Sequence, residues 1–268
     1  MRSPGATFNL RGALSEEVNA ALGELNITPL REKGLHRCRV HLKRARALAR
    51  IGRACAPGLS AVFNDTARGV MRSLAQARDL AALAESAREL AKKSKKKSAA
   101  ALNNVADGFD HERREMAPLN LEVARAGLRD LLALAQVWPE ASPRQIERGA
   151  ERIALRARKA CGRGRNASAP PRRHEWRKRE KDRLYASTLL DRSWPDDFKR
   201  RRKRGERLSD VLGRERDLLL LIQRVEADPN IAGSLKHAEA ALKTLRQRRD
   251  RLGRRADLLG AMLHKGGA

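Results

Sequence analysis

Aromatic residues, cysteines, acidic residues and long apolar runs are all scarce in this chain of 268 residues. Aromatic residues make up only 3% of the chain and runs rich in Val, Ile, Thr or Tyr are few, so strands have little support and an all-α fold is predicted. No stretch comes near the roughly 18 consecutive apolar residues of a membrane-spanning helix. The sequence therefore predicts a helical protein without a transmembrane span.

The three cysteines, Cys38, Cys55 and Cys161, have neither paired nor metal-like spacing. Such a set is typical of reduced thiols in the cytoplasm. No apolar segment follows residues 1–5, so no signal peptide is expected. No cluster of His, Cys and Asp has the spacing of metal ligands, and we expect neither a metal site nor a cofactor.

Acidic residues are far fewer than basic residues. Asp and Glu number 32 against 59 Lys and Arg, which gives a formal net charge of +27. Solubility alone does not require so large an excess, and it indicates a polyanionic partner. Nucleic acid, an acidic membrane surface and an inorganic polyanion are the candidates.

The positive charge is concentrated on a predicted helix that begins near His36. At about 100° per residue, one side of this helix collects five basic side chains and no carboxylate: His36, Arg39, Lys43, Arg46 and Arg50. An ordinary solvated face would alternate Glu with Lys at four-residue spacing. This face requires a polyanion, carboxylates from neighbouring helices, or salt.

The same pattern occurs a second time, 138 residues later. His36, Arg39 and Lys43 correspond to His174, Arg177 and Lys181. At the same offset, the stretch 74–80 (LAQARDL) corresponds to 212–218 (LGRERDL). Two separate matches with one offset indicate an internal duplication.

The periodicity predicts antiparallel helices joined by short connections, in bundles of the four-helix type. The clearest break is Trp138–Pro143, so we place the two repeats at residues 1–140 and 141–268. The predicted helices cover residues 12–26, 34–54, 60–91, 98–115, 119–137, 144–162, 173–192, 198–226 and 233–263.

The repeated pair of motifs resembles the CHAD family, the conserved histidine α-helical domain. The resemblance is carried by His36–Arg50, Leu74–Leu80, His174–Tyr185 and Leu212–Leu218. It implies two four-helix bundles related by pseudo-two-fold symmetry, with basic helices that line a groove or pore between them. It further implies non-catalytic binding of inorganic polyphosphate there, and a cytoplasmic location with association to polyphosphate granules.

Carried over by position, the resemblance gives His36, Arg39, Lys43, Arg44 and Arg46 in the first motif, and His174, Arg177, Lys178, Lys181 and Tyr185 in the second. The second motif departs from the first, because Asp182 and Leu184 stand where Arg44 and Arg46 stand in the first half. Arg183 and the run Lys199–Arg204 are the candidates to compensate. The predicted binding set therefore also includes Arg50, Arg78, Arg183, Arg201, Arg202 and Arg216.

Other interpretations stay open. Nucleic acid is the second choice of partner; single-strand binders use aromatic stacking worth roughly 1–3 kcal/mol per base, and only Trp176 and Tyr185 lie in the motif helices. A phosphotransfer or hydrolytic enzyme would need a Gly-rich phosphate loop, a carboxylate cluster or a nucleophile that this sequence lacks, so no catalysis is expected. His36 and His174 are either ligand contacts or structural histidines. The runs Lys92–Lys97 and Lys199–Arg204 are by default solvated helix ends.

Overall fold

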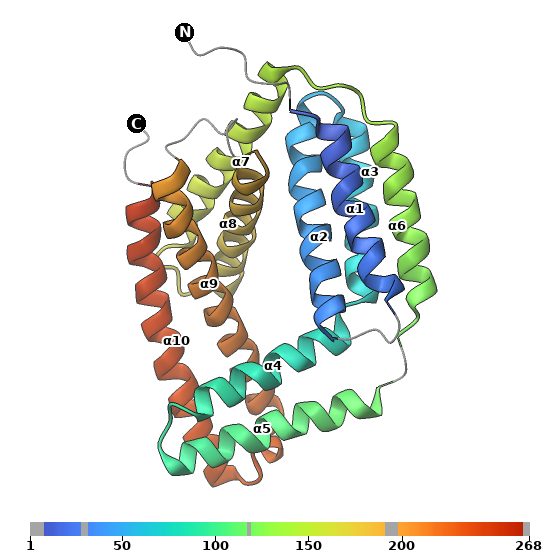
Figure 1. Ribbon diagram of the computed structural model, residues 1–268. Coiled ribbons are helices and arrows are strands. Elements are labelled where there is room, and N and C mark those ends of the chain that lie inside the picture. The colour runs from blue at the N-terminus through green and yellow to red at the C-terminus, as the bar shows by residue number, and fades with distance from the viewer. Residues whose placement is uncertain (1–7, 28–31, 117–118, 191–197, 265–268) are drawn as a thin grey trace. The chain divides into compact units, whose positions relative to one another are not determined.

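Figure 1 shows the computed structural model, which describes residues 8–27, 32–116, 119–190 and 198–264. Within these ranges every regular element is helical and no strand occurs, so the predicted all-α class is confirmed. The chain divides into two compact units. Unit 1 comprises Met1–Ala75, Leu119–Gly164 and Glu175–Glu206, and unit 2 comprises Gln76–Pro118, Arg165–His174 and Arg207–Ala268.

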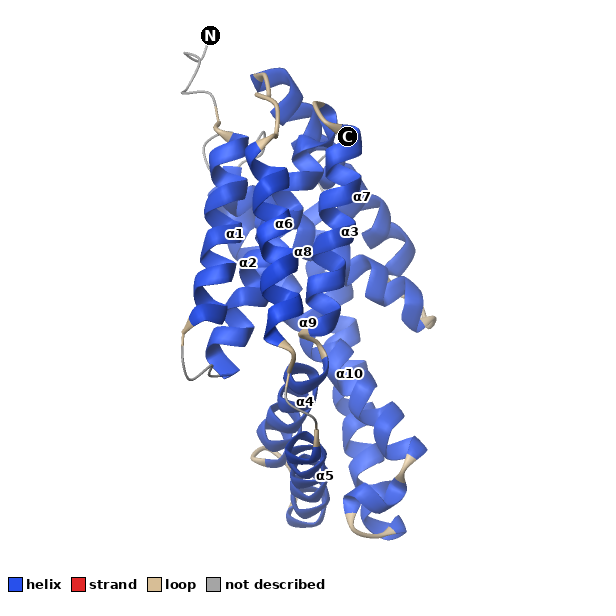
Figure 2. Ribbon diagram, turned by 90° about the vertical axis from the view of Figure 1, so that its right-hand side faces the viewer, coloured by secondary structure: helices blue, strands red, loops and turns tan. Residues whose placement is uncertain are grey.

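Unit 1 contains a four-helix bundle in which each helix packs against two others, in the cyclic order α1, α2, α3, α6 (Figures 1 and 2). The 3-10 helix η1 joins α2 to α3, and α7 packs against both α2 and η1. The bounds of these elements are α1 Leu10–Asn26, α2 Glu32–Ile51, η1 Gly52–Ala54, α3 Pro57–Ser73, α6 Leu121–Gln136 and α7 Pro143–Gly164.

Apolar side chains at three- and four-residue spacing form the core of this bundle. On α1, Leu14, Val18 and Leu25 are fully buried, as expected for one stripe of an amphipathic helix. Trp138, which follows α6, packs edge-on against Phe63 of α3 with ring centroids 5.9 Å apart. The core therefore uses two of the few aromatic residues to fill the space between helices.

Two glycines allow close packing around the end of α2, where Gly149 lets α7 approach. A Cβ atom at Gly149 of α7 would overlap the backbone of Ile51, the last residue of α2. A Cβ atom at Gly52 would overlap the ring of Trp138. These contacts fix the register of α7 against α2 and η1, and so place the basic residues of α7 beside that junction.

Unit 2 contains the antiparallel pair α4 (Gln76–Ala91) and α5 (Lys96–Glu115), and the last helix, α10 (Leu235–His264), packs against α5. The turn before α10 docks on α5 through a hydrogen bond of 3.0 Å from the Asn104 side chain to the Ala232 carbonyl. Two helices contribute to both units: α8 (Pro170–Leu190) and α9 (Phe198–Ala227).

The predicted helices agree with the observed ones except over residues 60–91, where the prediction of one long helix is wrong. The chain forms two helices there, and α3 ends at Ser73 before α4 begins at Gln76. Leu74 leaves the helical region with φ −99° and ψ 9° and is fully buried. Arg39 donates hydrogen bonds of 3.1 Å to the carbonyls of Met71 and Leu74, which stabilises the break.

The division into repeats at residue 140 remains a prediction. The repeats are defined by the predicted internal duplication of the sequence. The two compact units are instead defined by contacts in space, and each takes segments from both halves of the chain. The α4–α5 pair of the first half belongs to unit 2, while α1, α2, α3 and α6 remain together in unit 1.

Candidate anion-binding site

The basic helix α2 separates its faces as the sequence predicts. Leu42, Ala45 and Ala49 are fully buried in the core of unit 1. On the other side, His36 is exposed, and the longer side chains that follow it are partly exposed: Arg39, Lys43, Arg46 and Arg50. The helix is therefore amphipathic in the usual way, with an apolar face in the core. Its outer face is unusual because these five side chains are all basic.

Two of the predicted binding residues on α2 make contacts within the bundle. Arg39 donates to the carbonyls that end α3, where a cation is favoured by the helix dipole. Arg44 points toward α1, with its guanidinium 3.6 Å from the carboxylate of Glu17. The same carboxylate lies 2.6 Å from His41. Both arginines therefore help to hold the bundle together.

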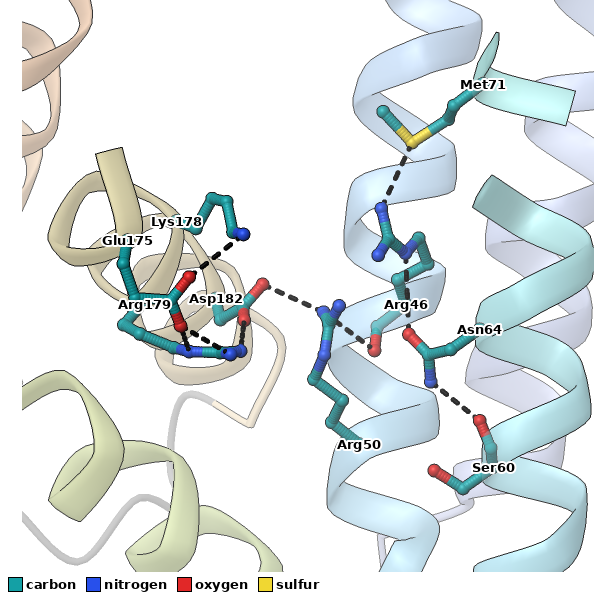
Figure 3. Close-up of polar contacts among 9 residues, drawn as sticks. All are labelled: Arg46, Arg50, Ser60, Asn64, Met71, Glu175, Lys178, Arg179 and Asp182. Atoms are coloured by element: carbon teal, nitrogen blue, oxygen red, sulfur yellow. Dashed lines mark hydrogen bonds and ion pairs between the residues drawn. The ribbon is translucent and has the colours of Figure 1, made fainter. Parts of the chain in front are cut away.

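Arg46 and Arg50 lie nearer the C-terminal end of α2, where Arg46 contacts α3 and Arg50 contacts α8 (Figure 3). Arg46 is 3.4 Å from the side-chain oxygen of Asn64 and 3.5 Å from the sulfur of Met71, both on α3. Arg50 donates a hydrogen bond of 2.8 Å to Asp182 of α8. Neither contact of Arg46 involves a carboxylate, so its charge is not neutralised by direct pairing.

On α8, carboxylates and cations alternate over two turns (Figure 3). Glu175 contacts Lys178 at 2.9 Å and Arg179 at 2.6 Å. Arg179 also reaches Asp182 at 3.3 Å, so Asp182 lies between Arg179 and Arg50. Asp182 thus connects the two helices by a shared ion pair.

Arg46 and Arg50 of α2, with three arginines whose charges act on one or both of them, form a set that we call the arginine cluster. The three are Arg68 of α3, Arg156 of α7 and Arg179 of α8. Burial, together with the neighbouring charge of Arg50, lowers the pKa of Arg46 to about 10. Burial also lowers the pKa of Arg50, although Asp182 opposes this. Arg46 therefore remains cationic at neutral pH, but its surroundings favour an added negative charge.

Other predicted binding residues of unit 1 lie outside the arginine cluster and make separate contacts. Lys181 lies 5.9 Å from the ring centre of Tyr185, within the range of a cation–π contact. Arg183 is buried and bonds Glu180 at 3.0 Å, and Glu180 also accepts a hydrogen bond from Trp176. Arg183 is therefore part of the interior of unit 1, and its compensation for Asp182 remains a prediction.

A model of the CHAD domain family matches residues 13–226, most of the chain. The chain belongs to the CHAD domain family. The resemblance read from the repeated motifs is confirmed by this match.

A solved CHAD structure has the same fold. It is the crystal structure of the CHAD domain from the plant Ricinus communis, which is 18% identical to this chain, with a TM-score of 0.69. The alignment covers 100% of this chain and 96% of the plant domain. Among curated proteins, no sequence matches this chain.

Several residues expected to bind in a CHAD domain lie outside the arginine cluster. Arg177 and Lys178 are on α8, and Arg202 pairs with Glu206 at 3.4 Å on α9. Arg78, His174 and Arg216 belong to unit 2. The side chains of Arg78 and Arg201 fall outside the described residues.

The basic runs are exposed where their side chains are described. In the first run, the lysines at 92, 93, 95, 96 and 97 are all exposed, and Lys92 pairs with Glu89 at 2.7 Å. In the second, Arg202, Lys203 and Arg204 are exposed. Their surroundings match those of solvated helix ends, and a role in binding remains a prediction.

Sequence reasoning missed Arg68, Arg156, Arg179 and Asp182 as site residues. Arg156 and Arg179 lie more than 100 positions from α2 in the chain, and no local spacing links them to Arg50. One signal was present: Asp182 stands out as the acidic residue where the first motif has Arg44. That departure marks the residue that pairs with Arg50.

Metal and membrane chemistry receive no support from the described part of this CHAD chain. It contains no group of three or more His, Cys, Asp or Glu side chains able to hold a metal ion. Among the same residues, no helix is both long and apolar enough to span a membrane.

Proposed function

We propose that this CHAD protein binds inorganic polyphosphate without catalysis, and that the arginine cluster of unit 1 makes the principal contacts. The observation that supports this most is Arg46, a partly buried cation whose nearest polar partners are a neutral amide and a thioether. The charges of three further guanidinium groups, from α2, α3 and α8, act on Arg46. A phosphate chain would supply the missing negative charge.

The chemistry of the cluster suits a ligand made only of phosphates. Guanidinium groups present planar forks of donors that bind phosphate oxygens in pairs. Neighbouring helix positions place such groups about 5–6 Å apart at Cβ, so successive side chains can reach successive phosphates. Burial lowers the pKa of Arg46, and an adjacent phosphate would offset that effect.

The proposed function involves no catalytic step. Burial raises the pKa of the Cys38 thiol to about 12, so that side chain is protonated at neutral pH and is a poor nucleophile. The carboxylates that contact the cluster are each paired with one of its arginines: Asp65 with Arg68, Glu175 with Arg179 and Asp182 with Arg50.

The direct test is a variant in which two cluster residues lose their charge, Arg46→Gln with Arg50→Gln. Long-chain polyphosphate should bind this variant at least about tenfold more weakly, since each lost charge-assisted contact is worth about 1.5–3 kcal/mol. Isothermal titration calorimetry measures the change. The control variant replaces Arg129 and Arg144 with Gln; both are exposed in unit 1 and outside the cluster, and they remove the same net charge.

Equal loss of affinity in the two variants would show that overall charge, not the arginine cluster, binds the ligand. A competition titration addresses the alternative partner. If excess duplex or single-stranded DNA displaces polyphosphate at physiological salt, nucleic acid becomes the better assignment. Circular dichroism melts verify that each variant is folded.

A further inference from the structure

A second basic feature of unit 1 lies at the junction of α7 with η1 and the start of α3. It is a pocket of about 480 Å³ whose lining contains four cationic and two apolar side chains and no acidic one: Arg53, Pro57, Arg152, Leu155, Arg156 and Lys159. Its volume falls within the range of roughly 300–1,000 Å³ that is typical of small-molecule sites. All six side chains are exposed, so a ligand can enter from solvent.

The α7 residues of this pocket share one face of the helix. Arg152, Arg156 and Lys159 follow at four- and three-residue spacing, with Leu155 between them. No Asp or Glu stands three or four positions from any of the three cations. Like charges at this spacing destabilise a helix, so the face carries an electrostatic cost that an anion would remove.

Helix packing brings a further positive charge to this face of α7, and the pocket lining contains no carboxylate that would neutralise it. Gly149 brings α7 against the end of α2, and Arg53 of η1 joins the α7 cations in the pocket. Burial and the charges of Arg179 and Arg53 lower the pKa of Arg156, although Asp182 and Glu175 oppose this. Within the described part of the chain, none of the four lining cations forms an ion pair.

We propose that this pocket binds a compact oligophosphate, an anion with two or three linked phosphates, at a site distinct from the long-chain site although the two share Arg156. Four cations that line one open pocket match a short, highly charged anion, which can contact several of them at once. Leu155 and Pro57 supply the apolar part of the lining, which limits how many phosphates contact cations at once. Arg156 belongs to both the pocket and the arginine cluster, but Arg152 and Lys159 belong to the pocket alone.

That difference allows the two sites to be tested separately, with tripolyphosphate as the short probe. The variant Arg152→Gln with Lys159→Gln removes two pocket charges at exposed positions and leaves the cluster intact. We expect tripolyphosphate to bind it at least about tenfold more weakly in calorimetry, with less than about a threefold change for long-chain polyphosphate. The Arg46→Gln, Arg50→Gln variant should show the opposite pattern.

The variant that replaces Arg129 and Arg144 with Gln again serves as the control for net charge. Unchanged tripolyphosphate affinity in the pocket variant would overturn the inference, as would an equal loss in the control. Failure of the long-chain proposal gives a different result: the Arg46→Gln, Arg50→Gln variant would then bind long-chain polyphosphate no more weakly than the control does. A crystal soaked with tripolyphosphate should show density between Arg53 and Arg152; density only at the arginine cluster would contradict the pocket.

Discussion

Asp182 is the residue that decides how much of the cluster's charge is available to a ligand. It lies 2.8 Å from Arg50 and 3.3 Å from Arg179, and it is mostly buried. A carboxylate in this position acts as an internal anion, and under the proposed function it would compete with phosphate for the same guanidinium groups. It also stabilises the unliganded protein, because two arginines close together would otherwise repel each other.

Replacement of this carboxylate should therefore have opposite effects on stability and on affinity. For Asp182→Asn we expect the free energy of unfolding to fall by about 1–3 kcal/mol without ligand, since a partly buried ion pair loses one member. Polyphosphate should bind the variant about three- to tenfold more tightly. Thermal unfolding with and without polyphosphate measures both effects, because a ligand that binds the folded state raises Tm.

The matched control is Asp107→Asn, which removes an exposed carboxylate paired with Arg88 in unit 2. It should change neither quantity by more than about 0.5 kcal/mol. Weaker polyphosphate binding by Asp182→Asn would mean that Asp182 positions Arg50 for the ligand instead of competing with it.

Among the elements, α7 carries three of the four cations that line the pocket. Its position depends on Gly149, where the absence of a side chain lets the helix contact the backbone of Ile51. The same contact places Arg152 and Arg156 beside η1. A second glycine of α7, Gly162, has no atom within 4 Å of an added Cβ and provides a comparison within one helix.

Alanine at these two positions should act in opposite directions. Gly149→Ala should lower the free energy of unfolding by about 1–3 kcal/mol, because α7 must move away from α2. It should also weaken tripolyphosphate binding, since the pocket widens. Gly162→Ala should be neutral or should stabilise by up to about 1 kcal/mol, because alanine has the higher helix propensity. Urea unfolding measures both; equal stability of the two variants would contradict the close packing.

For the molecule as a whole, the net charge of +27 raises the question of whether binding is local or diffuse. A diffuse cationic surface would attract any polyanion in proportion to total charge. A defined cluster instead neutralises a small, fixed number of phosphates. The dependence of affinity on salt distinguishes the two, because its slope counts the contacts.

If the five residues of the arginine cluster each neutralise one phosphate charge, a plot of log K against log salt should have a slope of roughly −3 to −4, by analogy with single-stranded nucleic acid. The Arg46→Gln, Arg50→Gln variant should reduce the magnitude of the slope by about 1.4. The control lacking Arg129 and Arg144 should keep the parental slope. A slope that follows net charge alone in both variants would support diffuse attraction.

Sequence alone determined the helical class, the strong positive charge, the basic face of α2 and the family. These properties depend on composition and on spacings of three, four and 138 residues, which are local or periodic and can be read directly. Arg46 and Arg50 were identified for this reason. The break between α3 and α4 was not, because it depends on hydrogen bonds from Arg39, 32 and 35 positions away.

The tertiary structure alone decided which cations act together. Helix packing brings Arg50 to Asp182, 132 positions away, and directs Arg44 to Glu17 and Arg183 into the interior. It also turned a stripe of charge on α7 into one wall of a pocket, because Gly149 fits against Ile51. Charge interactions depend on distance in space and on burial, and neither is fixed until the helices are packed.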